Sequence, residues 1–180
     1  MKKQFSGFTL IEILVVISII SILSAVIYAS FGDARANSRD KVRKTSLKEL
    51  ALAIELYKSQ YGVYPALGCG ATTEWAGPGP QVSSDTTTCK DYIAGLVPEF
   101  ISELPTDPNA EQESGQGFMY RVSPAGDSYK ALVQDSVESD VVTGFNNEFA
   151  RCPSAIVGSP CAAGAPENTY AIYSPGAESW

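Results

Sequence analysis

The stretch Gly7-Phe8-Thr9-Leu10-Ile11-Glu12 begins a hydrophobic segment that continues, interrupted only by four serines, as far as Phe31. About 20 apolar residues are needed to span a hydrocarbon core of about 30 Å. The run is long enough for this, and Lys2 and Lys3 precede it. It therefore predicts a membrane-spanning helix whose basic end lies on the cytoplasmic side. No convincing small-residue cleavage site follows the run, so we expect the helix to stay in the membrane.

Glu12 is the unusual residue of this segment. A charge at the centre of a bilayer costs roughly 2.5–3.5 kcal/mol on insertion scales, so a carboxylate inside such a run is a candidate functional residue. The alternative is a plain signal anchor in which Glu12 lies at the membrane interface, where a charge costs less.

The stretch from Gly7 to Glu12 closely resembles the signature of type IV prepilins and type II secretion pseudopilins. The resemblance implies that a prepilin peptidase/methyltransferase cleaves after Gly7 and N-methylates Phe8. It also implies that Glu12 neutralises the new amine of a neighbouring subunit, since opposite charges attract more strongly at low dielectric constant. The implied partners are this peptidase, further copies of the chain, minor pilins and an inner-membrane assembly platform.

The rest of the chain predicts an α+β fold, and the resemblance implies that it is of the pilin type. We expect a leader at 1–7, a membrane and filament-core helix at 8–31, an amphipathic continuation at 32–61 and a globular head at 62–180. An apolar stripe at helical spacing predicts which face of the continuation packs on the head. Its members are Leu47, Leu50, Ile54, Tyr57 and Tyr61. Gly62 and Pro65 mark the end of the helix, and the Y-G-x-Y-P ending also resembles the family.

Within the head, residues 91–101 predict a short helix distorted by Pro98. Three segments rich in β-branched and aromatic residues predict strands at 118–122, 129–133 and 170–173. The first two are joined by a turn at 124–127, so they predict an antiparallel hairpin, to which the third strand adds. The stretch Leu104-Pro105-Thr106-Asp107-Pro108 resembles type II secretion major pseudopilins, although Asn109-Ala110 stands where that motif continues Trp-Gly.

All four cysteines follow the membrane segment, namely Cys69, Cys89, Cys152 and Cys161. An even number on the exported side predicts two disulfides with three possible connectivities. Sequential pairing is the simplest because each bond then closes one loop. Free buried thiols are the alternative.

Composition excludes several functions. The chain has no histidine, which removes the commonest general base and transition-metal ligand, and no carboxylate pair stands out, so we expect no enzyme. The net charge of −7 argues against a nucleic-acid surface. One basic group follows the membrane segment and is interpreted as a solvated or inter-subunit helix face, or as a lipid contact. It comprises Arg35, Arg39, Lys41, Arg43, Lys44 and Lys48.

Asp135, Glu138 and Asp140 are candidate calcium ligands, because secretion-type major pseudopilins hold calcium in a C-terminal loop. No EF-hand pattern is present, and a solvated acidic loop is the favoured interpretation. No other cofactor is expected.

The favoured function is a structural subunit of a type IV filament, inserted in the inner membrane before assembly and extracellular or periplasmic afterwards. One alternative is the major pseudopilin of a type II secretion system. A second is an uncleaved, membrane-anchored binding protein.

Overall fold

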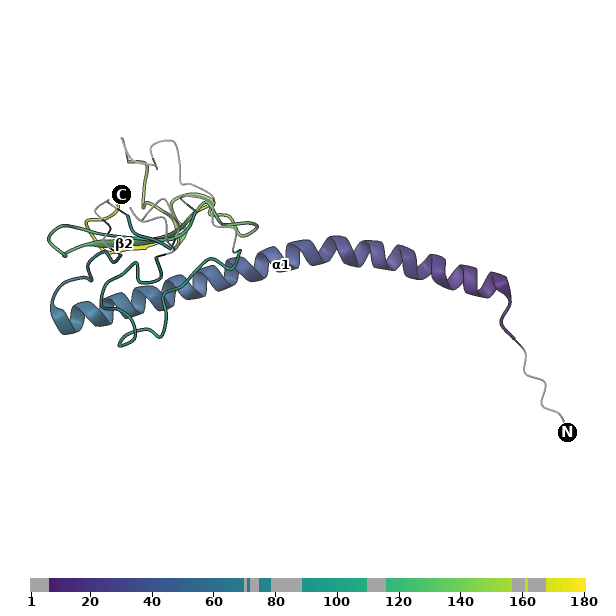
Figure 1. Ribbon diagram of the computed structural model, residues 1–180. Helices are drawn as coiled ribbons and strands as arrows, with labels where there is room; N and C mark the ends of the chain where they lie inside the picture. The colour runs from purple at the N-terminus through teal and green to yellow at the C-terminus, as the bar shows by residue number, and fades with distance from the viewer. Residues whose placement is uncertain are drawn as a thin grey trace. The chain divides into compact units, whose positions relative to one another are not determined.

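The structure is a computed structural model that describes residues 7–69, 71, 75–78, 89–109, 116–156, 161 and 168–180. The elements follow in the order α1 (Leu10–Tyr61), β1 (Gly117–Val122), β2 (Tyr129–Gln134) and β3 (Tyr170–Tyr173) (Figure 1). The chain divides into two compact units, Met1–Ala36 and Asn37–Trp180. Residues 1–6 of the predicted leader lie outside the described residues.

Helix α1 begins at Leu10, two residues later than the expected start at Phe8. It ends where predicted. Gly62 follows it with a φ of 81°, a left-handed conformation that glycine adopts without a Cβ penalty. The Gly62 N–H donates to the carbonyl oxygen of Lys58 at 2.8 Å, which satisfies one of the last carbonyl groups of the helix.

In the first unit, the apolar part of α1 is exposed. It is the one helix in the described part of the chain that is long and apolar enough to cross a membrane. Ser18 and Ser21 donate their hydroxyl protons to the carbonyl oxygens of Leu14 and Ile17, both at 2.7 Å. These serines thereby satisfy their own hydroxyl donors within the helix, which makes them compatible with a lipid environment.

In the second unit, the three strands form an antiparallel sheet in the order β1-β2-β3. The register places Tyr120 opposite Ala131 and Leu132 opposite Ala171. The pilin-like α+β fold and the three strands are therefore confirmed. The turn joining β1 to β2 includes Gly126 at a φ of 68°, the position where the chain needs a left-handed residue.

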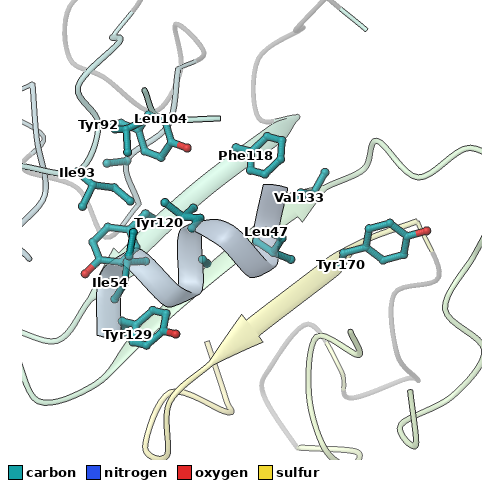
Figure 2. Close-up of a cluster of buried hydrophobic side chains, with 14 of the residues drawn as sticks. Leu47, Ile54, Tyr92, Ile93, Leu104, Phe118, Tyr120, Tyr129, Val133 and Tyr170 are labelled. Atoms are coloured by element: carbon teal, nitrogen blue, oxygen red, sulfur yellow. The ribbon is translucent and has the colours of Figure 1, made fainter. Parts of the chain in front are cut away.

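The core lies between the sheet and the part of α1 that belongs to this unit. Leu47, Leu50 and Ile54 are fully buried. Figure 2 shows Leu47 and Ile54 of α1 among Phe118, Tyr120 and Val133 of the strands. The predicted burial of the stripe is confirmed at these three positions, and burial decreases toward the end of the helix.

Tyr61 differs from the prediction, because it is 51% exposed. It lies on the last turn of α1, beyond the buried stretch, and its ring contacts that of Tyr57 in a tilted arrangement with centroids 4.5 Å apart. Tyr57 is partly buried and contacts Phe100 at 5.4 Å between centroids. The final turn therefore carries an aromatic group at the edge of the core.

The prediction of a short helix at 91–101 is wrong, because the chain forms turns there. This segment pairs instead with the residues that follow α1. Leu67 and Ile93 form an antiparallel bridge, and the Ala94 N–H donates to the Ala66 carbonyl oxygen at 2.9 Å. The apolar side chains that suggested a helix, Tyr92, Ile93 and Leu96, are buried in the core. The backbone groups of Tyr92 and Ala94 bond to residues 68 and 66, and Gly95 at a φ of 74° interrupts the helical conformation.

Two disulfides join Cys69 to Cys89 and Cys152 to Cys161, with Cα atoms 6.0 and 6.3 Å apart. Sequential pairing is therefore confirmed. Beside the first bond, Gly68 approaches the backbone of Asp91 so closely that a Cβ at Gly68 would overlap the Asp91 carbonyl oxygen. Only glycine fits at this crossing of two chain segments.

Candidate functional site

The predicted cleavage site lies just before α1. Gly7 and Phe8 are both exposed, and the side chain of Phe8 is 84% exposed. A Cβ added at Gly7 would meet no atom within 4 Å. A glycine at this position is thus not required by any contact that the structure describes, and the bond between Gly7 and Phe8 lies in a non-helical, accessible segment.

Glu12 takes part in a capping box with Thr9. The backbone N–H and the hydroxyl of Thr9 both donate to Glu12 Oε2 at 2.7 Å. In return, the Glu12 N–H donates to the Thr9 hydroxyl oxygen at 3.3 Å. This reciprocal arrangement satisfies N–H groups that the first turn of a helix leaves unpaired, and it explains why α1 begins at Leu10. The sequence contains the signal of this box, T-x-x-E at Thr9 to Glu12, which the expected helix start at Phe8 overlooked.

A second group of charges lies in the other unit, between α1 and the head. We define the Arg43 cluster as Arg39, Asp40, Arg43, Asp107 and Glu138. Arg43 is 1% exposed and lies at its centre. Its guanidinium donates to the two Asp107 oxygens at 2.9 and 2.7 Å, to Asp40 at 2.8 Å and to Glu138 at 2.8 Å. Burial disfavours the charge of Arg43, but the hydrogen bonds to Asp107 and Glu138 outweigh burial and raise its pKa.

Asp40 connects this cluster to the loop after β2. Its carboxylate accepts the backbone N–H groups of Glu138 at 3.1 Å, Ser139 at 2.7 Å and Asp140 at 2.9 Å. Burial raises the pKa of Asp40, but the hydrogen bonds from these N–H groups and from Arg43 together lower it by more. The net pKa is therefore below its ordinary value. One helix side chain thereby holds three consecutive residues of the loop.

The acidic residues proposed for calcium are placed in this neighbourhood. Glu138 forms ion pairs with Arg39 and Arg43, and the hydrogen bond from Arg39 is the main reason that its pKa is lowered. Asp140 pairs with Lys44 at 2.6 Å, while Asp135 is exposed. Within the part of the chain that the structure describes, no group of three or more His, Cys, Asp or Glu side chains could hold a metal ion.

The basic group seen in the sequence is thus directed largely at the head of the same chain. Arg39, Arg43 and Lys44 pair with the loop after β2, and Lys48 pairs with Glu148 at 3.2 Å. For the buried Arg43 this differs from the interpretation as a solvated face, whereas Arg35, Lys41 and Lys48 are exposed. Periodicity showed that the basic residues share a helix, but not which of them a loop covers.

A further cation is buried in the sheet itself. Lys130 of β2 is fully buried, and its amine donates to the main-chain oxygens of Ala177, Glu178 and Trp180 at 3.3, 3.1 and 2.8 Å. The Arg121 guanidinium lies 4.6 Å from the Trp180 ring centroid. These contacts hold the residues after β3 against the sheet.

Comparisons with known proteins agree with these features. Residues 2–28 match the family described as the prokaryotic N-terminal methylation motif. The N-terminal segment of the chain is thus similar to the N-methylation-motif family of type IV pilins and type II pseudopilins. It is also 37% identical over 65 residues to the type II secretion system core protein G of Pseudomonas aeruginosa.

That match covers 36% of this chain and 46% of the relative, so it spans less than half of either protein. No solved structure matches the chain. In its N-terminal motif and its fold, the protein is accordingly pilin-like or pseudopilin-like.

Proposed function

We propose that this pilin-like protein is a structural subunit of a type IV filament. It is inserted in the inner membrane through α1, cleaved after Gly7 and N-methylated at Phe8. It then polymerises through the exposed apolar part of α1 and leaves the membrane as part of an extracellular or periplasmic filament. In the growing filament, the Glu12 carboxylate pairs with the Phe8 amine of a neighbouring subunit.

The observation that carries this proposal is the arrangement of Gly7, Phe8 and Glu12. The bond to be cleaved is exposed and precedes the helix, while Glu12 is held on the first turn by the capping box. Both hydrogen bonds that Thr9 donates go to Oε2, and among the described residues Oε1 accepts none. The carboxylate is thus oriented by its own chain and keeps an oxygen for an incoming amine.

Mass spectrometry of the protein purified from its own cells tests the processing step. We expect a mature chain that begins at Phe8 and carries one additional methyl group, together with an intact precursor when the peptidase is absent. A protein that still begins at Met1 in the presence of the peptidase would instead support the uncleaved membrane-anchored binding protein.

Substitution of Glu12 tests the assembly step. Glu12→Gln keeps the capping box, since glutamine serves in that position as well, but it removes the charge. We expect this variant to be inserted and cleaved normally and to yield at least about tenfold fewer filaments, because a 1.4 kcal/mol loss of pairing already costs that factor. Electron microscopy of sheared filaments measures it. Ser18→Ala, which changes a polar residue of the same helix, is the matched control and should assemble normally. Normal filaments from Glu12→Gln would contradict charge pairing.

A second candidate function is the major pseudopilin of a type II secretion system. The identity to core protein G favours it, as does the stretch from Leu104 to Pro108. Deleting the gene distinguishes the two candidates. Loss of protein export without loss of surface filaments would assign the chain to secretion, and the reverse result would assign it to a pilus.

A further inference from the structure

We propose that the Arg43 guanidinium provides the positive charge that organises this part of the head. The loop at 135–142 is then held to α1 without a divalent metal ion. The resemblance to secretion-type major pseudopilins implies calcium in a C-terminal loop. In this chain, the donor set around the candidate calcium ligands Glu138 and Asp140 does not fit such an ion, for two separate reasons.

The first reason is charge and position. Asp40, Asp107 and Glu138 all direct carboxylate oxygens at the Arg43 guanidinium, at 2.7 to 2.9 Å. Calcium would need six to eight oxygen atoms at 2.3–2.6 Å around one point. The guanidinium occupies the point at which these oxygens converge, and arginine does not lose its proton in proteins. A divalent ion at the same place would meet a buried, permanent positive charge.

The second reason is the direction of the loop backbone. Calcium loops provide carbonyl oxygens to the ion. Here, residues 138–140 turn three consecutive N–H groups toward the Asp40 carboxylate, and the Ser139 hydroxyl also donates to it at 3.1 Å. Hydrogen-bond donors suit an anion and repel a cation. The loop is therefore built around a carboxylate from α1, which Arg43 in turn neutralises.

Arg39 and Lys44 extend this arrangement at the surface. Arg39 donates to both oxygens of Glu138, and Lys44 pairs with Asp140. Both acidic residues of this stretch, Glu138 and Asp140, are thus paired with a cation of α1. The positive charge that organises the loop comes from the same polypeptide, and it is present as soon as the head folds.

The first test uses the unchanged full chain in detergent micelles. Thermal unfolding is followed with EDTA in excess and with about 5 mM calcium chloride, which exceeds the dissociation constants of weak extracellular calcium modules. Hydrogen exchange at the amides of Glu138, Ser139 and Asp140 is measured under both conditions. We expect the same Tm within about 1 °C and the same protection of the three amides. A higher Tm with calcium, or loss of protection with EDTA, would overturn the proposal.

The second test compares two cations of the same helix. Arg43→Met removes the buried charge and leaves carboxylates unpaired, and we expect Tm to fall by roughly 10 °C. Lys48→Met is the matched control, since its partner Glu148 is exposed at the surface, and it should change Tm by less than about 3 °C. An equal fall in Tm for the two variants would show that Arg43 does not organise the loop. Should Arg43→Met fail to fold, the calcium and EDTA measurements on the unchanged chain still decide.

Discussion

Lys130 shows how much one side chain can contribute to the acid–base behaviour of this protein. Its amine is buried in β2 and is surrounded by main-chain oxygens, with the Tyr173 ring 4.7 Å away. The pKa of Lys130 is lowered from 10.5 to about 7, mainly by burial and in addition by the nearby Arg151 and Arg121, while Glu178 opposes the shift. Folding therefore removes a proton from this amine at mildly alkaline pH.

This shift predicts a pH dependence of stability. Above pH 7 the folded chain holds Lys130 neutral, whereas the unfolded chain keeps the proton up to about pH 10. The unfolded state thus binds more protons in this range, and the free energy of unfolding should rise with pH by roughly a few kcal/mol between pH 7 and 10. Urea unfolding at several pH values measures it. Lys130→Met should flatten the rise, and an equal slope in both proteins would contradict the assignment.

Gly68 provides a second prediction at the level of a single residue. A methyl group at this position would overlap the Asp91 carbonyl oxygen, which belongs to a neighbouring backbone and cannot rotate away. We expect Gly68→Ala to lower the free energy of unfolding by about 1–3 kcal/mol, as measured by urea unfolding. Gly32→Ala is the control, because a Cβ there meets nothing within 4 Å. In a helix this change should be neutral or stabilising by up to about 1 kcal/mol.

At the scale of the elements, the second part of α1 has two faces with different roles. Leu50 is fully buried against the sheet, whereas Leu52, two residues along, is 62% exposed. We expect Leu50→Ala to lower the free energy of unfolding by about 2–5 kcal/mol, because it removes buried area and leaves a cavity. Leu52→Ala should change it by no more than about 0.5 kcal/mol. If denaturant unfolding gave similar losses for both, the predicted orientation of the helix would be wrong.

Elements differ in how well local sequence predicts them. The helix was predictable because its spacing of apolar residues persists over many turns, and the strands because their residues favour extended structure and short turns separate them. Residues 91–101 were not predictable, because Ile93 and Ala94 form backbone contacts with residues 66 and 67, which lie far away in the sequence. A pattern of buried side chains does not reveal which backbone partners the segment finds.

At the scale of the whole molecule, the core is confined to one of the two units. Every buried residue of the main core cluster lies between Leu47 and Tyr170, and both disulfides and the Arg43 cluster also fall within residues 37–180. The first unit contributes exposed apolar side chains. The stability of the head should therefore be independent of the membrane segment.

This separation predicts that the fragment 37–180 folds by itself. Asn37 stands at its new helix start, and asparagine is a favourable N-cap. We expect the fragment to be soluble without detergent, to contain both disulfides and to unfold in one cooperative transition with a Tm within about 5 °C of that of the full chain. Circular dichroism and sedimentation measure these properties. An unfolded or aggregated fragment would show that the first unit stabilises the head.

The sequence by itself determined the features that depend on neighbouring residues. The motif at Gly7, Phe8 and Glu12 could be recognised because it is short and contiguous, and the apolar helix because hydropathy accumulates along one segment. The pairing of the cysteines stayed open among alternatives, since sequence does not contain distances between loops.

Only the tertiary structure decided what the basic group of α1 does. From spacing alone, Arg43 resembled the other cations of a solvated helix face. Its burial among Asp40, Asp107 and Glu138 depends on two loops that begin more than 60 residues away. The energy of a charge is set by what surrounds it in space, and burial and neighbouring charges arise only when distant parts of the chain come together.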